Sequence, residues 1–469
     1  MTKEPEVEAL EEAYTYTRRW LGNINEAKVG AVASVEALRA NFDMPLPESG
    51  ADPVKIITDL AKAAEPGLNI TSSGRFFAWV NGGCLASALA ADLLVTAWDQ
   101  NASMFAVSPA ASIIEEVAGN WMKDLLDLPR EASFAFTTGC QMAHTTALAA
   151  ARLSVLEQAG WALNEQGLFG APKIHLITSG NRHGSIDRAA RFLGFGQSSL
   201  LTVKTDEMGR MQAGDLCEVL SQAKGPKIVC LNAADLNVGA FDKFDELIPI
   251  AKEFNAWVHV DGAFGLYARA SRAKRHLLAG VELADSWATD GHKWLNVPYD
   301  CGIAIIRNSK AHRAAMTLSA DYIATENVAR DQIDWNMEWS RRARAIPVYA
   351  SLKELGRSGV EDMIDRCCTY CEAIINGIGV LAGARILAAP TLNQGLIRFE
   401  RPGASDEENN QYTLNIIEQI NKTGEAFFSS TLWRGARAMR VSVVNWRTNE
   451  EDVSRTIAAV QKVLQQSQV

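Results

Sequence analysis

Lys293 follows an apolar segment, in the sequence Asp-Gly-His-Lys-Trp-Leu. Most lysines are solvated surface residues, but the position after a strand candidate, between His292 and Trp294, weighs against that here. Desolvation beside a second cationic group lowers the pKa of a lysine, and the resulting free amine is a Schiff-base nucleophile. We therefore expect Lys293 to have a depressed pKa and to react with a carbonyl group.

Asp261 ends the apolar run Trp-Val-His-Val-Asp, 32 residues before that lysine. The small residues Gly262 and Ala263 follow and leave room for a flat molecule. A buried carboxylate is costly without a cationic partner, and a protonated pyridine nitrogen would serve as one. Taken alone, a helix cap or a structural ion pair is the more common role for such an aspartate.

Three further segments place polar residues after apolar strands, and one of them, Cys230-Leu-Asn-Ala-Ala-Asp235, carries polar groups that could face the same site. Thr137-Thr-Gly-Cys-Gln leads into an Ala-rich helix expected over 141–153, whose N-terminus would offer N–H groups and a positive dipole end to a phosphate. His183 follows a second strand and has a ring that could lie against a planar cofactor, although a lone histidine is more often structural. A phosphate site, a flat ring, an acid and a nucleophilic lysine together meet the requirements of pyridoxal phosphate.

The elements that must position these residues alternate along the middle of the chain. Amphipathic helices such as 243–254 separate apolar strands expected at 133–137, 174–178, 200–203, 228–232, 257–260, 286–289 and 302–306. This alternation predicts an α/β fold with a mostly parallel, seven-stranded sheet that is covered on both faces. Ligands of such sheets bind at the carboxyl ends of the strands, where the residues above fall.

The rest of the chain predicts two smaller parts beside a large cofactor-binding domain at 74–346. An N-terminal helical arm is expected over 1–73, ending after a stretch rich in proline and glycine. A smaller C-terminal α/β domain is expected over 347–469, with helices at 361–377, 406–422 and 449–466 and strands at 395–399, 427–433 and 439–444.

The bulk composition limits the classes of function. The formal net charge is −9 and the pI about 5.5, so nucleic acid is not an expected partner. The acidic N-terminus predicts no signal peptide, and the weakly polar run 76–91 is too interrupted to span a membrane. We expect a cytoplasmic protein with reduced cysteines, in which Cys368-Thr-Tyr-Cys371 is a structural part of a helix and not a metal site.

Two segments carry a family resemblance, His259-Val-Asp-Gly-Ala-Phe-Gly and Asp285-Ser-Trp-Ala-Thr-Asp-Gly-His-Lys-Trp. They resemble the group II pyridoxal-dependent decarboxylases, which include aromatic amino-acid, glutamate and diaminobutyrate decarboxylases. The likeness extends from about Arg75 to the C-terminal Arg-Val-Ser-Val-Val-Asn-Trp446. It implies the fold-type I architecture, pyridoxal 5′-phosphate as cofactor, a small amino-acid substrate, and a homodimer with shared active sites.

Matching positions imply roles for individual residues. The resemblance implies a Schiff base on Lys293, with His292 beside it, and a contact between Asp261 and the pyridine nitrogen. It implies that the cofactor ring lies between Ala263 and His183, with Asn232 as a polar neighbour. It also implies that Cys140 and Gln141 bind the phosphate and that Trp79, Asn81 and Gly82 contact the substrate. The aromatic residues near 76–98 hint at an aromatic substrate, but such residues are more often core.

Three departures from the family pattern concern the phosphate and the reaction. Asp290 replaces a frequent amide, and Ala234-Asp-Leu-Asn-Val replaces a Gly-Thr-Thr-rich turn. Gln332 lies near the place of a loop tyrosine that protonates the carbanion, whereas Tyr322 lies ten residues upstream, in a polar stretch that predicts a mobile loop.

The expected reaction is decarboxylation of an L-amino acid to the amine, with Lys293, His183 and Tyr322 as catalytic residues. Aldehyde synthesis, aldol-type cleavage and transamination remain as alternatives. A cofactor-binding regulator without turnover would be expected to lack Lys293 or Asp261, and both are present.

Overall fold

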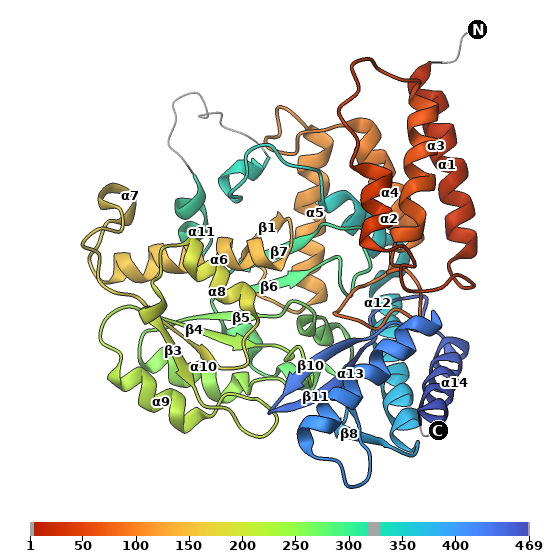
Figure 1. Ribbon diagram of the computed structural model, residues 1–469. Coiled ribbons are helices and arrows are strands. Elements are labelled where there is room, and N and C mark those ends of the chain that lie inside the picture. Colours follow the sequence, from red (N-terminus) through yellow and green to blue (C-terminus); the bar gives the residue numbers. More distant parts are fainter. Residues whose placement is uncertain (1–3, 318–328, 468–469) are drawn as a thin grey trace.

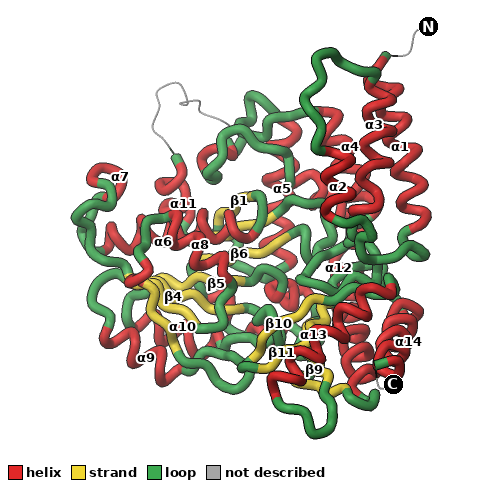
Figure 2. The backbone as a smooth tube through the Cα atoms, viewed as in Figure 1, coloured by secondary structure: helices red, strands yellow, loops and turns green. Residues whose placement is uncertain are grey.

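The structure is a computed structural model that describes residues 4–317 and 329–467. Its centre is a seven-stranded sheet in the order β1-β7-β6-β5-β4-β2-β3 (Figures 1 and 2). Strands β3, β2, β4, β5 and β6 pair in parallel, and β7 is antiparallel to both of its neighbours. The strands are β1 (Ser133–Thr137), β2 (His175–Ser179), β3 (Leu200–Val203), β4 (Lys227–Asn232), β5 (Trp257–Asp261), β6 (Ser286–Asp290) and β7 (Gly302–Ile306). The predicted α/β architecture is confirmed.

Helices cover both faces of this sheet, which explains why most of its strand residues are buried. On one face of the sheet, α6 contacts β5, β6 and β7 and packs against α8 and α11. On the other face lie α9 and α10, with α5 and α12 (Ala345–Gly379) nearby. Every residue of β1, β5, β6 and β7 is buried. The helices of this part are α4 (Ala86–Trp98), α5 (Pro109–Leu125), α6 (Cys140–Gln158), α7 (Leu163–Gln166), α8 (Gly184–Phe192), α9 (Ala213–Gln222), α10 (Phe244–Glu253) and α11 (Ser309–Met316).

A second, antiparallel sheet lies in the C-terminal part, in the order β10-β11-β9-β8. The sequence predicted three strands there and missed β8, a short edge strand with only one buried residue. Helix α12 begins beside the predicted domain limit and bends at Gly356, where φ is 59°. The elements are α12 (Ala345–Gly379), β8 (Ala384–Ala388), β9 (Gln394–Phe399), α13 (Asp406–Thr423), β10 (Ser429–Trp433), β11 (Ala436–Ser442) and α14 (Glu450–Gln466). The domain limits themselves stay predictions.

The N-terminal arm consists of α1 (Pro5–Asn23), α2 (Val35–Phe42) and α3 (Pro53–Ala64), with α1 and α3 side by side (Figure 1). Ser34 and Asp52 cap α2 and α3 by accepting backbone N–H groups. None of the residues in these three helices, all of which the structure describes, is buried. These three helices therefore add almost nothing to the core, whereas Ile24, Val29 and Ile70 in the segments between and after them are buried.

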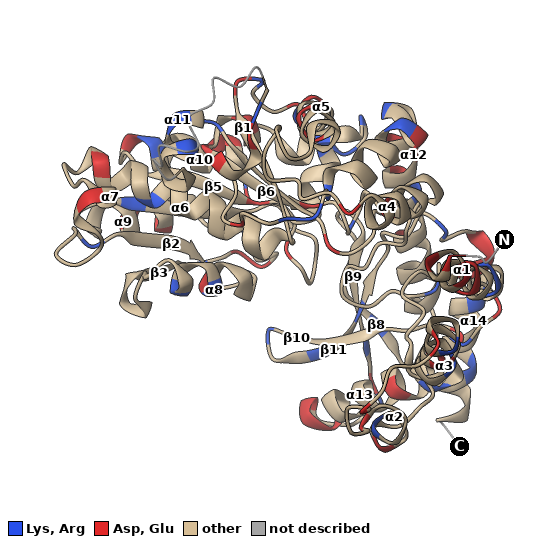
Figure 3. Ribbon diagram, turned by 90° about the horizontal axis from the view of Figure 1, so that it is seen from above, with Lys and Arg blue, Asp and Glu red and all other residues tan. Residues whose placement is uncertain are grey.

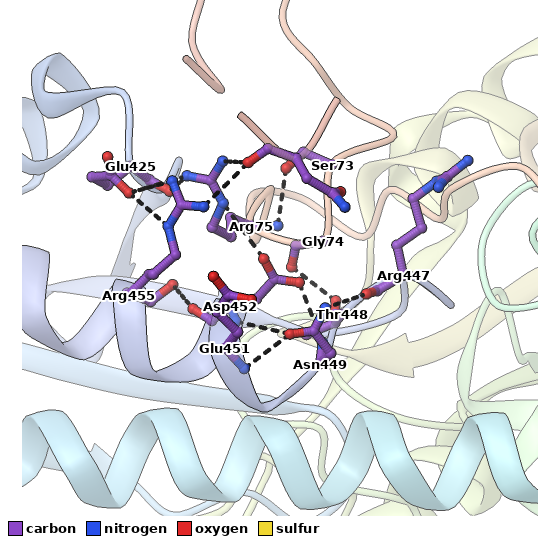
Figure 4. A network of polar contacts seen from close by, with 12 residues as sticks. Ser73, Gly74, Arg75, Glu425, Arg447, Thr448, Asn449, Glu451, Asp452 and Arg455 are labelled. Atoms are coloured by element: carbon purple, nitrogen blue, oxygen red, sulfur yellow. Dashed lines mark hydrogen bonds and ion pairs between the residues drawn. The ribbon is translucent and has the colours of Figure 1, made fainter. Parts of the chain in front are cut away.

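Arg75 ties the arm to the C-terminal part (Figure 4). Its side chain is 1% exposed; Nη2 donates to the carbonyl oxygen of Asn25 at 2.7 Å, and Nη1 donates to the backbone and side chain of Glu425. Its Nε lies 3.5 Å from Asp452 Oδ1. A buried guanidinium needs such partners, and here they come from three segments that are far apart in the sequence.

Acidic and basic residues are interspersed along the helices (Figure 3). No helix in the described ranges is both long and apolar enough to cross a membrane.

All eight cysteines are free. Cys368 and Cys371 are buried within α12, and the sequence predicted their place in a helix. A cytoplasmic location stays a prediction.

Candidate active site

A cavity of about 680 Å³ opens at the carboxyl ends of β4, β5 and β6. Asn232, Asp261 and Asp290 are the last residues of these strands, and each lines the cavity. Most of the predicted site residues are brought together here: Trp79, Asn81, Cys140, Gln141, His183, Asn232, Asp261, Ala263, His292 and Lys293. Tyr322 lies outside the described residues.

Lys293 forms an ion pair with Asp290, whose Oδ2 lies 3.1 Å from Nζ. Burial lowers the pKa of Lys293, but Asp290, Cys140 and Asp261 together outweigh it, so the net pKa is raised. The expected depressed pKa is therefore wrong for the free lysine, because the sequence did not show that Asp290 would face it.

Each carboxylate oxygen of Asp261 has one close polar neighbour. Oδ1 accepts from the backbone N–H of Ala263 at 3.2 Å, and Oδ2 lies 3.5 Å from His144 Nε2. Burial alone would raise the pKa of Asp261, but His144, with smaller contributions from His183 and Lys293, holds it well below its usual range. The carboxylate at this cavity wall is therefore ionised.

The N-terminus of α6 forms the end of the cavity where the sequence predicted a phosphate site. Gly139 precedes the helix with φ of 142°, a conformation that favours glycine. Gln141 Nε2 is buried and has no hydrogen-bond partner within the described part of the chain. The backbone N–H of Cys140 instead donates to Asp290 Oδ1 at 2.6 Å. Asp290, which replaces an amide that is frequent in the family, therefore occupies one backbone N–H group of this helix end.

Two side chains on the cavity wall are fixed by local hydrogen bonds. His183 precedes α8, and its Nδ1 accepts from Ser185 N at 3.2 Å, with Ser185 Oγ at 2.7 Å. Asn232 Nδ2 donates to Ser179 Oγ at 3.2 Å. The cavity therefore has the groups that fit pyridoxal phosphate: the flat ring of His183, the unpaired buried amide of Gln141, the buried acid of Asp261 and the amine of Lys293.

The predicted substrate segment reaches the cavity at Trp79 and Asn81. Gly82 is not among the described lining residues: a Cβ added to it would lie 2.0 Å from the carbonyl oxygen of Lys293. Glycine is required there because this segment packs directly on the backbone of the lysine. Of the aromatic residues considered for a substrate, Phe76 and Phe77 are buried in the core.

The turn after β4 forms without the glycine and threonines of the family pattern. Ala234 has a φ of 71°, and Asp235 Oδ1 accepts the backbone N–H groups of Asn237 and Val238 at 2.8 and 2.9 Å. An aspartate can build such a turn with its own side chain. Ala234 and Asp235 line the cavity, so the departure keeps the turn at the site.

The structure adds residues that sequence reasoning missed. Tyr299 donates to Asn81 Oδ1 at 2.6 Å, and its ring stacks on His292 with centroids 4.3 Å apart. Arg440, from β11, lines the cavity; burial lowers its pKa to about 10, so it stays charged. Tyr299 lies close to the lysine motif in the sequence and could have been suspected, whereas nothing in the sequence around Arg440 indicates this place.

Cys140, His144 and Asp261 offer atoms within 4.8 Å of one another, near enough together to hold a metal ion. These atoms are already in contact, because Cys140 Sγ lies 3.3 Å from His144 Nε2. Burial raises the pKa of the Cys140 thiol well above its usual value. In this structure the Cys140 thiol is hydrogen-bonded to His144.

Comparison with known proteins agrees with this geometry. The family model described as pyridoxal-dependent decarboxylase conserved domain matches residues 36–400. An aromatic-L-amino-acid decarboxylase of Bacillus atrophaeus is 26% identical over 95% of this chain and 92% of the relative. A 4-hydroxyphenylacetaldehyde synthase of Rhodiola rosea is 26% identical over 87% of this chain and 85% of the relative.

Solved structures share the fold. A crystal structure of Oryza sativa TDC with PLP and tryptamine superimposes with a TM-score of 0.91 at 21% identity, covering 98% of this chain and 97% of that one. A crystal structure of mouse CSAD has a TM-score of 0.90 at 24% identity, covering 97% and 98%. These likenesses confirm the fold-type I architecture.

Proposed function

The chain belongs to the pyridoxal-dependent decarboxylase family, whose cofactor is pyridoxal phosphate, and we propose that it converts an L-amino acid to the amine and CO2. The observation that carries the proposal is the placement of Lys293 and Asp261 on one cavity, each beside a group that controls its charge. When bound, pyridoxal phosphate supplies an electron sink for the bond that breaks at the substrate α-carbon.

Lys293 would hold the cofactor covalently, and in the free protein Asp290 pairs with its ammonium group at 3.1 Å. Asp261 would keep a proton on the pyridine nitrogen, because an ionised carboxylate stabilises a cation facing it. Gln141 and the N-terminus of α6 would hold the phosphate, and His183 and Ala263 would enclose the ring. Asn232 and His292 are further polar residues that line the cavity.

The opposite side of the cavity would orient the substrate. Trp79 and Asn81 line it, and Tyr299 fixes the amide of Asn81 through the hydrogen bond at 2.6 Å. Arg440 adds a positive charge that suits a carboxylate. The backbone of Gly82 packs against the backbone of Lys293.

A product screen tests the reaction. The purified protein is incubated with pyridoxal phosphate and each of the twenty amino acids and several diamines, and CO2, amine, aldehyde and hydrogen peroxide are measured. We expect amine and CO2 in equal amounts for at least one substrate. Aldehyde and peroxide in step with CO2 would instead establish aldehyde synthesis, the activity named for the Rhodiola rosea relative.

Tyr322 is the residue that we propose as proton donor to the α-carbon. Tyr322→Phe should leave CO2 release measurable and shift the product from amine towards aldehyde with peroxide, because an unprotonated carbanion persists and reacts with oxygen. Tyr299→Phe is the matched control, since it removes a cavity hydroxyl that binds Asn81 and should leave the amine fraction unchanged. An unchanged amine fraction in Tyr322→Phe would contradict the assignment and make His183 the next residue to replace.

The proposed assembly is a homodimer with shared active sites, and two surfaces support it. The arm leaves Leu10 and Leu60 about half exposed, at 49% and 52%. Helix α4, on the same side of the molecule, is mostly apolar, and its Leu94 and Trp98 are 46% and 48% exposed. Exposed apolar side chains that gather on one surface mark an interaction site, and a second copy of the chain would bury them.

Replacing Leu60 and Leu94 together with glutamate should separate the dimer, because each new charge would lose its hydration at the interface. Light scattering after gel filtration should give twice 51.0 kDa for the wild type and 51.0 kDa for the variant. Val380→Glu is the control, since Val380 is 84% exposed on the C-terminal part. A monomeric wild type would contradict the proposal.

A further inference from the structure

A chain of buried polar side chains runs from the interior of the sheet to Asp261. Trp257, His259 and Asp261 alternate along β5 and therefore point to the same face, towards α6. Trp257 Nε1 donates to Ser286 Oγ at 2.9 Å, and that oxygen lies 2.9 Å from His259 Nδ1. His259 Nε2 lies 2.9 Å from His144 Nδ1, and His144 Nε2 faces Asp261 Oδ2 at 3.5 Å.

Two directions of hydrogen bonding are possible along this chain when both histidines are neutral. In the first, Ser286 Oγ accepts from the indole of Trp257, which can only donate, and Ser286 donates its own O–H to His259 Nδ1. His259 then carries its proton on Nε2 and donates to His144 Nδ1. His144 is left with a proton on Nε2, which faces Asp261 Oδ2 at 3.5 Å and the Cys140 sulfur at 3.3 Å.

The opposite direction is unfavourable. It would place a nitrogen lone pair of His144 against an ionised carboxylate, which repels it. Burial, with a smaller effect of His144, lowers the pKa of His259 to about 3, which agrees with a neutral ring in the middle of the chain.

We propose that Ser286, His259 and His144 are positioning residues that fix the His144 N–H on Asp261 and so hold this carboxylate in place for the cofactor. The inference rests on the proposed function, because it assigns these residues to the acid that faces the pyridine nitrogen. His144, His259 and Ser286 are fully buried, where apolar side chains would pack without any need for hydrogen bonds. Buried polar chains of this kind specify one orientation only when every member is satisfied.

The test is His259→Phe, which fills the volume and removes both ring nitrogens from the chain. His144 can then turn its proton away from Asp261, and the affinity for pyridoxal phosphate should fall by roughly tenfold, as is typical when the support of a binding group is removed. The visible absorption band of the bound cofactor should also shift, since the hydrogen bonding of the carboxylate that faces its ring nitrogen changes. Ser286→Ala removes a single oxygen and should act in the same direction; it replaces His259→Phe if that variant does not fold.

His312→Phe is the matched control. His312 is also fully buried, its Nδ1 lies 2.9 Å from Ser133 Oγ, and its Nε2 lies 2.9 Å from the carbonyl oxygen of Trp335, but it has no contact with the cavity. This variant should lose thermal stability as His259→Phe does and keep both the cofactor affinity, within about twofold, and the absorption band.

The outcomes separate the inference from the function on which it rests. Wild-type affinity and an unshifted band in both His259→Phe and Ser286→Ala would overturn the positioning role while leaving the decarboxylase assignment intact. Equal losses in His259→Phe and His312→Phe would also overturn it, because the effect would then come from packing. A wild-type protein that binds no pyridoxal phosphate would overturn the proposed function itself.

Discussion

Lys293→Ala should lose turnover by roughly 10⁴-fold or more, because it removes the only amine at the cavity that can bind the cofactor covalently among the described lining residues. The wild type should show the visible band of a lysine-bound cofactor and, after borohydride reduction, a label on the peptide that contains Lys293. The variant should show neither. Mass spectrometry of the reduced, digested protein is the measurement.

Lys293→Arg separates charge from covalent chemistry in the same experiment. Arginine keeps a positive charge that can pair with Asp290, so the fold and the electrostatics of the wall should survive, but its guanidinium does not form the covalent link. We expect it to be as inactive as Lys293→Ala with a thermal stability closer to the wild type. A covalent label and full turnover in either variant would show that another residue carries the cofactor.

Asp261→Asn should bind the cofactor more weakly and cut turnover by about two to four factors of ten. Removing one partner of a buried ion pair costs roughly 3–5 kcal/mol, and each 1.36 kcal/mol of transition-state energy is a factor of ten. Asparagine has nearly the same shape and can still accept the N–H of Ala263, so the loss would report the charge. The measurements are the cofactor dissociation constant and kcat with the substrate found by the screen.

Asp242→Asn is the control for the loss of any buried carboxylate. Asp242 is 3% exposed, accepts the backbone N–H groups of Asn232 and Met211, and does not line the cavity. Its variant should change stability and leave kcat within a few-fold of the wild type. A kcat for Asp261→Asn within about tenfold of the wild type would contradict the proposed role of Asp261.

The sheet and the strand-end positions of Asp261, Lys293 and Asn232 could be predicted because their signals are local. An apolar run of five residues followed by small and polar residues indicates a buried strand and its end, and parallel strands end at the same edge. The motif around Lys293 added the family. The edge strand β8 was not predicted, because its polar and apolar residues alternate only weakly and its burial depends on neighbours from other segments.

Only the tertiary structure decided the electrostatics of the site. The pKa of Lys293 depends on the 3.1 Å distance to Asp290, and the charge of Asp261 depends on His144, which comes from α6, more than a hundred residues earlier in the chain. Arg440 and the contact between Tyr299 and Asn81 are likewise long-range. Coulombic and hydrogen-bond energies vary steeply with distance and burial, and neither quantity is present in the order of residues. The sequence by itself determined the chemistry available to this protein, and the fold determined which groups meet and in which protonation state.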